Sequence, residues 1–85
     1  MKGYKITKYK NRRLYDNQES RYCNLNYIRG LIQRGTKFWV EDKETGDDIT
    51  VRILLEVLLQ MDKEGEIYWG VSDLRYAIRV SPDKR

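Results

Sequence analysis

The sequence predicts a small α+β domain, and three observations support that prediction. The chain has 85 residues, enough for one domain with a modest core and too few for a multi-domain enzyme. Its N-terminal part contains short segments in which apolar and polar residues alternate, as in half-exposed strands. Its later part carries apolar residues at helical spacing. We therefore expect a single domain, residues 1–85, with β-hairpins and two to three helices.

The first predicted strands lie near the N-terminus. Residues 4–8 alternate with a period of two and include aromatic and β-branched side chains. Segments 14–16 and 21–23 flank the polar residues 17–20, which suit a hairpin turn. Most of the N-terminal basic residues are therefore expected on strands and on the connections between them.

A helix is predicted at residues 25–34. Asn24 suits its N-cap, and Gly35 can adopt the left-handed conformation that ends a helix. The apolar positions that share one face are Leu25, Ile28, Leu31 and Ile32. A short strand is expected within 37–42, followed by a turn and a return segment, 43–49, as a second hairpin.

The strongest predicted helix runs from Val51 to about Glu64, with Asp48 or Thr50 as its cap and Gly65 as its end. Apolar residues cover more than half of its circumference, so we expect burial on more than one side, by the domain, by a partner subunit or by both. We expect a homodimer, held by Leu54, Leu55, Leu58 and Leu59.

A third helix is predicted at residues 73–80, within a C-terminal segment 66–80. Ser72 suits its N-cap, and residues 81–85 are expected to be a frayed tail. Its inward positions are predicted to be Leu74, Ala77 and Ile78. Because a strand rather than a second helix follows the first helix, the order does not fit a helix-turn-helix motif.

The charges divide unevenly along the chain. Lys and Arg number 17 and Asp and Glu 13, for a net charge of +4. Residues 1–35 hold nine basic and two acidic side chains, whereas the remaining 50 residues hold eight basic and eleven acidic ones. Such asymmetry indicates a polyanionic partner for the N-terminal half, nucleic acid first and an anionic membrane surface second.

The residue types that the chain lacks argue against some classes of function. The chain has no histidine and a single cysteine, Cys23, so it lacks the commonest general base and a cysteine-built metal site. We expect no enzyme activity, no metal and no cofactor. No apolar run reaches the ~18 residues of a membrane-spanning helix, and we expect a cytoplasmic, nucleoid-associated protein with no membrane role.

Residues 8–16 combine cations, an amide and aromatic rings. Arginine can bind phosphate or guanine as a fork, asparagine can pair with adenine, and tyrosine hydroxyls can reach phosphate. The residues expected to contact double-stranded DNA are Lys8, Tyr9, Asn11, Arg12, Arg13, Tyr15 and Arg21. The alternative is that the charges form a solvated face and the tyrosines pack on the sheet.

Other groups have structural explanations. The acidic segment 44–48 lacks calcium-loop spacing and suits a turn before a helix. Trp39, Tyr68 and Trp69 are expected in the core or at an interface. Arg75 and Arg79, four residues apart, can extend a phosphate-binding face or form the solvated side of a helix.

A family resemblance joins several of these features. The segment Ile6–Asp16, which contains Lys-Tyr-Lys-Asn-Arg-Arg-Leu-Tyr-Asp, is followed by Ser20-Arg21-Tyr22, by residues 42–50 and by the leucine-rich helix. Together, over residues 4–64, they resemble the N-terminal DNA-binding domain of bacterial polyhydroxyalkanoate synthesis repressors. Relatives usually have acids where this chain has Asn26 and Tyr27.

The resemblance implies a transcriptional regulator that binds promoter DNA and represses genes for polyhydroxyalkanoate synthesis and granule-associated proteins. Family members also bind the polymer. Typical relatives continue past the position of Ser72 with further helices, so we do not expect polymer or granule binding to carry over to this chain.

Two other functions fit the residues. An RNA-binding or general polyanion-binding module would use the same cations, with aromatic stacking on unpaired bases. A protein-interaction adaptor would use Trp39, Tyr68, Trp69 and the apolar helix.

Overall fold

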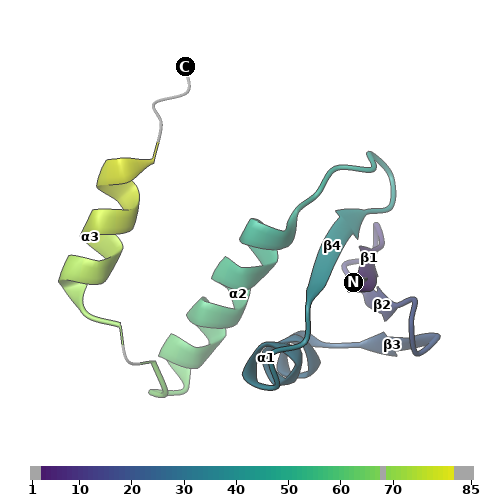
Figure 1. Cartoon of the computed structure of the whole chain (residues 1–85), viewed down its shortest axis with the longest axis horizontal. Helices are drawn as coiled ribbons and strands as arrows, with labels where there is room; N and C mark the ends of the chain where they lie inside the picture. Colours follow the sequence, from purple (N-terminus) through teal and green to yellow (C-terminus); the bar gives the residue numbers. More distant parts are fainter. Residues whose placement is uncertain (1–2, 68, 82–85) are drawn as a thin grey trace.

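The fold is described here from a computed structural model, which describes residues 3–67 and 69–81. In these residues four strands and three helices follow one another in the order β1 (Tyr4–Lys8), β2 (Leu14–Asp16), β3 (Arg21–Cys23), α1 (Leu25–Gln33), β4 (Phe38–Asp42), α2 (Thr50–Lys63) and α3 (Val71–Val80). The predicted α+β class is confirmed. The strand β4 follows α1 (Figure 1), as the sequence predicts, so α1 is not the first helix of a helix-turn-helix motif.

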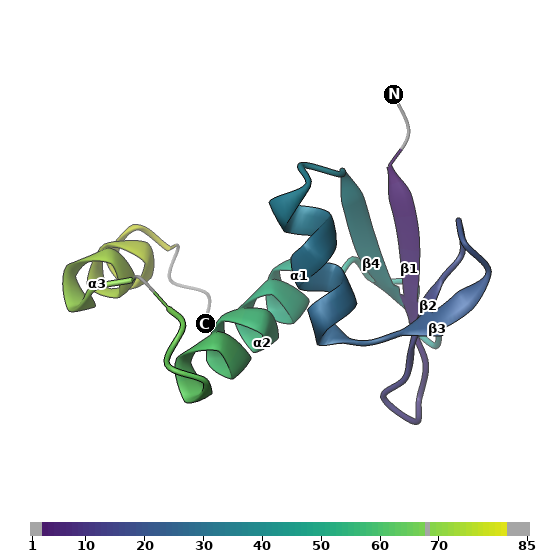
Figure 2. The same cartoon turned by 90° about the horizontal axis from the view of Figure 1, so that it is seen from below.

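The four strands form one mixed sheet in the order β3-β2-β1-β4. β2 pairs antiparallel with both β1 and β3, and β4 pairs parallel with β1. A parallel neighbour requires a crossover connection, and α1 supplies it. Figure 2 shows α1 and α2 on one side of the sheet. No helix of the described residues covers the other side, which we call the open face.

The core lies between the sheet and these two helices. Its buried members are Ile6, Leu14, Ile28, Leu31, Val40, Ile49, Ile53 and Val57. The alternation along the strands explains this composition, because side chains at every second position point to the same face. β1 and β4 contribute Ile6 and Val40, which are paired in the register of the sheet.

The predicted ends of α1 are confirmed. The Asn24 side chain accepts a hydrogen bond from the Tyr27 backbone N–H at 2.9 Å, as an N-cap does. Gly35 has a φ of +74°, the left-handed conformation expected after a helix. Between these ends, Ile28 and Leu31 are buried and belong to the same core cluster as Ile6 and Val40 of the sheet.

The start of α2 differs from the prediction, because neither Asp48 nor Thr50 is the N-cap. Ile49 occupies that position without a side-chain cap. Asp48 accepts a hydrogen bond from the Thr50 N–H at 2.9 Å. The Thr50 hydroxyl oxygen instead accepts from the Val40 N–H at 2.8 Å, so it ties the helix to β4 rather than capping it.

The second predicted hairpin is present only in reduced form. After β4 the chain turns through Gly46, which has a φ of +77°. The return segment pairs with β4 through one isolated antiparallel bridge, Glu41 with Asp48, and the Ile49 N–H donates to the Val40 carbonyl at 2.8 Å. Ile49 then enters the core, so the return segment serves to position α2.

α3 is the largest departure from the prediction. It starts at Val71 after Gly70, so Ser72 is inside the helix and not its N-cap, and Asp73 accepts from the Gly70 N–H at 2.9 Å. No α3 residue is buried. The positions predicted to point inward, Leu74, Ala77 and Ile78, are therefore exposed, because no other element covers them in the described chain. Of the predicted tail, residues 82–85 lie outside the described residues.

The Asp16 carboxylate is the buried polar group that joins the sheet to α1. Asp16 is fully buried, and one of its oxygens accepts from the backbone N–H groups of Gln18 and Glu19 at 2.8 and 3.1 Å. The other accepts from the Tyr27 hydroxyl. That hydrogen bond is the largest cause of the raised pKa of Tyr27. One side chain thus shapes the turn between β2 and β3 and fixes α1 beside it.

Replacing Asp16 should strongly destabilise the fold. In an Asp16→Ala chain the donors of Gln18, Glu19 and Tyr27 lose their acceptor, so we expect the free energy of unfolding to fall by about 2–4 kcal/mol. Urea unfolding followed by circular dichroism measures this. Asp47→Ala removes an exposed acid from another turn and should stay within about 0.5 kcal/mol of the parent. Equal effects of the two substitutions would contradict the assignment.

The single cysteine should react slowly in the folded state. Burial, followed by the charge of Asp16, raises the pKa of Cys23 to about 11, so the thiol is protonated at pH 8. We expect alkylation by iodoacetamide at pH 8 to be at least about tenfold slower than in the urea-unfolded chain. The rate should climb as the pH approaches 11. Equal rates in the folded and unfolded chains at pH 8 would contradict this.

Candidate nucleic-acid interface

The densest cluster of cations lies on the turn between β1 and β2, residues 9–13. Two backbone hydrogen bonds close this turn, from the Tyr9 N–H to the Arg13 carbonyl and from the Arg12 N–H to the Tyr9 carbonyl, both at 2.9 Å. The Asn11 side chain accepts from the Arg13 N–H at 3.1 Å. The loop is therefore held by its own backbone and by one amide.

Arg12 has an unusual backbone conformation in this turn. Its φ is +70°, in the left-handed region that glycine adopts readily and that costs other residues about 1–2 kcal/mol. Hairpins that contain a turn followed by such a residue normally have glycine there. Because this conformation costs free energy at an exposed turn, we infer that the Arg12 side chain has a function.

Next to the turn, three tyrosines cluster on the open face of the sheet. Tyr15 and Tyr22 are paired in register between β2 and β3, with ring centroids 5.2 Å apart. The ring of Tyr9 lies 6.3 Å from each of them. The Arg13 guanidinium lies 4.5 Å above the Tyr22 ring, within cation–π range. The turn and this cluster form one continuous surface, which we call the turn-tyrosine surface.

A cavity of about 510 Å³ lies at the edge of the turn-tyrosine surface. Three cations line it, Lys8, Arg12 and Arg13, together with apolar side chains that include Leu14, Leu25 and Ile53. Lys8 also pairs with Glu56 of α2 at 3.7 Å. The pair is partly exposed, so it is weak, and a phosphate arriving from solvent can compete with Glu56 for Lys8.

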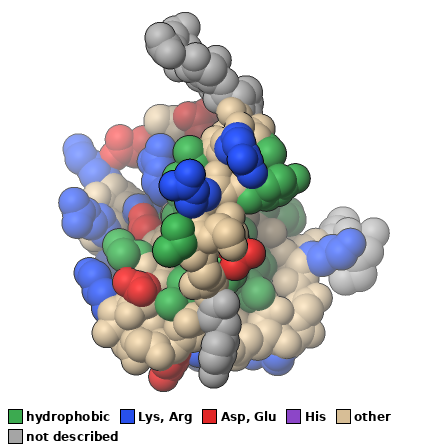
Figure 3. Space-filling view, turned by 90° about the vertical axis from the view of Figure 1, so that its left-hand side faces the viewer, with side chains coloured by type: hydrophobic (Ala, Val, Ile, Leu, Met, Phe, Trp, Pro, Cys, Tyr) green, Lys and Arg blue, Asp and Glu red, His purple; other side chains and the backbone are tan. Residues whose placement is uncertain are grey.

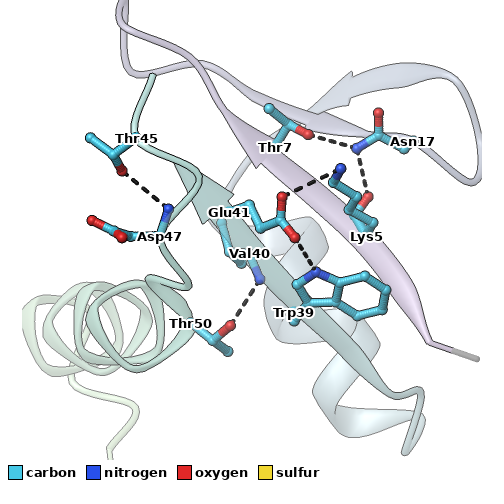
Figure 4. A network of polar contacts seen from close by, with 9 residues as sticks. All are labelled: Lys5, Thr7, Asn17, Trp39, Val40, Glu41, Thr45, Asp47 and Thr50. Atoms are coloured by element: carbon cyan, nitrogen blue, oxygen red, sulfur yellow. Dashed lines mark hydrogen bonds and ion pairs between the residues drawn. The ribbon is translucent and has the colours of Figure 1, made fainter. Parts of the chain in front are cut away.

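The other half of the open face is occupied by internal polar contacts, drawn in Figure 4. Glu41 accepts from the Trp39 indole N–H at 3.0 Å and pairs with Lys5 at 3.4 Å. The Asn17 amide donates to the Thr7 hydroxyl and to the Lys5 carbonyl. The Trp39 hydrogen bond is the largest cause that lowers the pKa of Glu41, so this carboxylate stays charged. An acid there repels a phosphate backbone and confines the candidate interface to the turn-tyrosine surface.

Five of the seven residues predicted to contact DNA lie on this surface, namely Tyr9, Asn11, Arg12, Arg13 and Tyr15. Lys8 lies opposite the buried Leu14 in the sheet register and pairs with Glu56 of α2, so its side chain is on the helix-covered side, where it lines the cavity. Arg21 does not lie on the surface either. It pairs with the buried Asp16 in the sheet register, and its guanidinium lies 4.9 Å from the Tyr27 ring of α1. Arg21 therefore points to the helix-covered side.

Two residues of the surface were not among the predicted contacts. Tyr22 is 53% exposed and contacts both other tyrosines and Arg13. Lys10 is exposed in the turn itself. The hairpin predicted around residues 17–20 could have identified Tyr22, because its register places Tyr22 opposite Tyr15 on the same face.

The leucines predicted to hold a dimer divide into two sets on α2. Leu55 and Leu59 are more than half exposed. Leu54 and Leu58 are half-buried and line an apolar groove against α1. Both sets are available for contacts outside the described chain.

The remaining candidate groups, where described, belong to structural contacts or to exposed surface. Trp39 belongs to the polar network, Trp69 is 47% exposed, and Tyr68 lies outside the described residues. Asp48 of the acidic turn accepts from Thr50, which lowers the pKa of its carboxyl. Within residues 3–67 and 69–81, no three His, Cys, Asp or Glu side chains are grouped to hold a metal. No described helix has both the length and the apolar composition to cross a membrane.

Comparison with known protein families finds a match to most of the chain. Residues 5–65 match the family described as the PHB/PHA accumulation regulator DNA-binding domain. The match covers β1 from Lys5 onward, the other three strands, α1 and α2, and it ends before α3. It therefore includes the whole turn-tyrosine surface.

Two relatives are similar to most of the chain. The chain is 43% identical over 74 residues to a protein of Thiocystis violacea named "Uncharacterized protein in phbA 5'region", covering 87% of this chain and 54% of the relative. It is 40% identical over 74 residues to an uncharacterized protein of Allochromatium vinosum, covering 87% of this chain and 48% of the relative. The chain thus spans about half the length of these relatives.

No solved structure gives a significant match to the chain. The family match, however, extends over most of the sequence and includes the strained arginine turn, the tyrosines beside it and the buried carboxylate that shapes the β2–β3 hairpin. This chain belongs to the family of PHB/PHA accumulation regulator DNA-binding domains.

Proposed function

We propose that the chain is the DNA-reading part of a transcriptional repressor and that its turn-tyrosine surface faces duplex DNA. The observation that carries the proposal is the turn at residues 9–13, which holds exposed cations on a backbone closed by its own hydrogen bonds. A preformed cationic loop loses little conformational freedom on binding. The major groove, about 12 Å wide, admits a two-stranded β-ribbon such as this one.

Phosphates are the first contacts of this surface. Lys8, Arg12 and Arg13 converge on one cavity, so a single phosphate group can meet more than one cation there. When a phosphate displaces Glu56 from Lys8, an internal ion pair is exchanged for an intermolecular one. Contacts of this kind set the position of the protein on the duplex and release counterions.

Asn11 and Arg12 at the tip are the residues placed to reach base edges. The Asn11 oxygen already accepts from Arg13, which leaves its amide N–H groups to donate. Their partners are therefore acceptors, such as the N7 and O6 atoms of purines. Arg12 can present its guanidinium fork to guanine from the same tip.

The aromatic cluster favours duplex over unpaired nucleic acid. Single-strand readers offer flat ring faces on which bases stack. Here the Tyr15 and Tyr22 rings meet edge to face, with planes 78° apart, and Arg13 covers one face of Tyr22. The cluster therefore supports the turn more than it offers a stacking platform.

The proposed repressor role and its cellular location rest on the family match. The Thiocystis relative is named for its position in the phbA 5′ region, and this supports control of polyhydroxyalkanoate genes in the cytoplasm of a bacterium. We propose that a homodimer held by α2, through Leu54, Leu55, Leu58 and Leu59, lets two copies address a symmetric site. Polymer binding and catalysis are not part of the proposal.

The substitution Arg12→Gly should weaken DNA binding without lowering the stability of the fold. Glycine relieves the left-handed strain, so the variant should unfold at the same denaturant concentration as the parent or a higher one. Its affinity for duplex DNA should fall, and the slope of log K against log salt, several units for the parent, should shrink by about one. Fluorescence anisotropy over a salt series measures both.

Arg34→Ala is the matched control, because Arg34 is an exposed arginine at the C-terminal end of α1. It should leave affinity and salt slope close to those of the parent. The proposed interface would be contradicted if the DNA affinity of the parent did not change with ionic strength, or if the Arg12→Gly variant bound DNA as well as the parent.

A further inference from the structure

The described chain exposes more surface than a compact monomer of its mass. It has 6942 Å² of accessible surface, whereas about 5,400 Å² is expected for a monomer of 10.3 kDa. Its radius of gyration is 14.1 Å, against about 12 Å for a globular chain of this length. The surplus, roughly 1,500 Å², exceeds the ~800 Å² that each partner buries in a standard protein interface.

α3 contributes to this surplus. Every residue of this helix is exposed, although Val71, Leu74 and Ile78 follow one another at spacings of three and four residues and share one face. Figure 3 looks onto this side of the molecule, where hydrophobic side chains reach the surface beside Lys and Arg. Isolated helices shorter than ~12 residues are marginal in water, so α3 requires a surface to pack against.

A groove of about 300 Å³ between α1 and α2 is such a surface. On α2, Leu54, Leu58 and Met61 line it at spacings of four and three residues, and the remaining lining residues are Arg29, Ile32, Gln33 and Val57. Apolar side chains dominate this lining. Grooves of this kind accept the apolar face of a helix whose anchors follow the i, i+3, i+7 spacing, which is the spacing of Val71, Leu74 and Ile78.

The helix and the groove also agree in length and charge. The ten residues of α3 extend about 15 Å, and the fourteen of α2 about 21 Å. Arg75 and Arg79 flank the apolar face of α3 and lie next to Ile78. Arg29, the charged residue of the groove lining, is already paired with Glu64 and Glu66, and Asp62, exposed and one turn beyond Leu58 on α2, adds an acid on that side of the helix.

We propose that α3 of each copy docks in the α1–α2 groove of a second copy. The α3 helix of the same chain does not fill the groove, since α3 stands away from α2 (Figures 1 and 2) although Glu66, which precedes it, pairs with Arg29 at 2.8 Å. A two-fold exchange covers both arms and both grooves with one type of contact. This deepens the dimer of the proposed function by naming the segment that holds the two copies together.

The exchange leaves the turn-tyrosine surface free. The groove lies on the helix-covered side of the sheet, whereas Tyr15 and Tyr22 lie on the open face (Figure 2). The exchanged dimer can therefore present two reading surfaces while its arms remain buried. Exchange can be measured without DNA, so its failure and the failure of DNA binding are separate results.

Engineered cysteines test which chain receives the arm. In a Cys23→Ser background, Leu58→Cys places a thiol in the groove and Ile78→Cys places one on the arm. Chains that carry only one of the two substitutions are mixed, oxidised and separated on a non-reducing gel. We expect disulfide-linked dimers containing one chain of each type. Chains that carry both substitutions should also give covalent dimers.

Three results would overturn the exchange. A disulfide within one doubly substituted chain would show that α3 folds back onto its own groove. The absence of any disulfide would place α3 elsewhere. Efficient linkage of either singly substituted chain to itself would show a different symmetric contact.

A second set of variants avoids engineered thiols. Leu74→Asp with Ile78→Asp should weaken self-association at least ~100-fold in analytical ultracentrifugation, because four charges would enter two apolar grooves per dimer. Ser72→Glu with Tyr76→Glu alters the opposite side of α3 and should leave the dimer unchanged. Equal dimerisation of both double variants, with the fold intact by circular dichroism, would overturn the proposal.

Discussion

The buried Asp16 carboxylate is the interaction on which the rest of the structure depends. It accepts from the turn between β2 and β3 and from Tyr27 of α1, so it fixes the β2–β3 hairpin and sets α1 on one side of the sheet. The fixed hairpin holds Tyr22 beside Tyr15. With both helices on the same side, the opposite face remains open for the tyrosines and the arginine turn.

The two sides of the sheet consequently have different chemistry. The open face ends in a cationic turn whose Arg12 is held in a strained backbone conformation, while an acid, Glu41, occupies its far half. The helix side presents apolar surface on α1, α2 and α3 that no described element covers. The two proposed partners, a duplex and a second copy of the chain, match these two chemistries and would approach from opposite directions.

Local sequence patterns were enough to predict the elements that depend on short-range interactions. Asn24, Gly35 and the alternation around Ile6 were sufficient to place α1 and β1. The pattern could not show that α3 stands away from the core, because Leu74 and Ile78 have the same helical spacing whether they pack in their own chain or in another. The face that Arg21 occupies could not be read from the pattern for a related reason. Only the register with Asp16 reveals which face it occupies.

The claim that the turn-tyrosine surface meets DNA is tested most directly by backbone and side-chain NMR of the full chain, titrated with a short random-sequence duplex at low salt. The account predicts that the largest shift changes occur at residues 9–13 and at the rings of Tyr15 and Tyr22. The network around Glu41 should change little. Largest changes on α1, or at Arg75 and Arg79 of α3, would contradict the account.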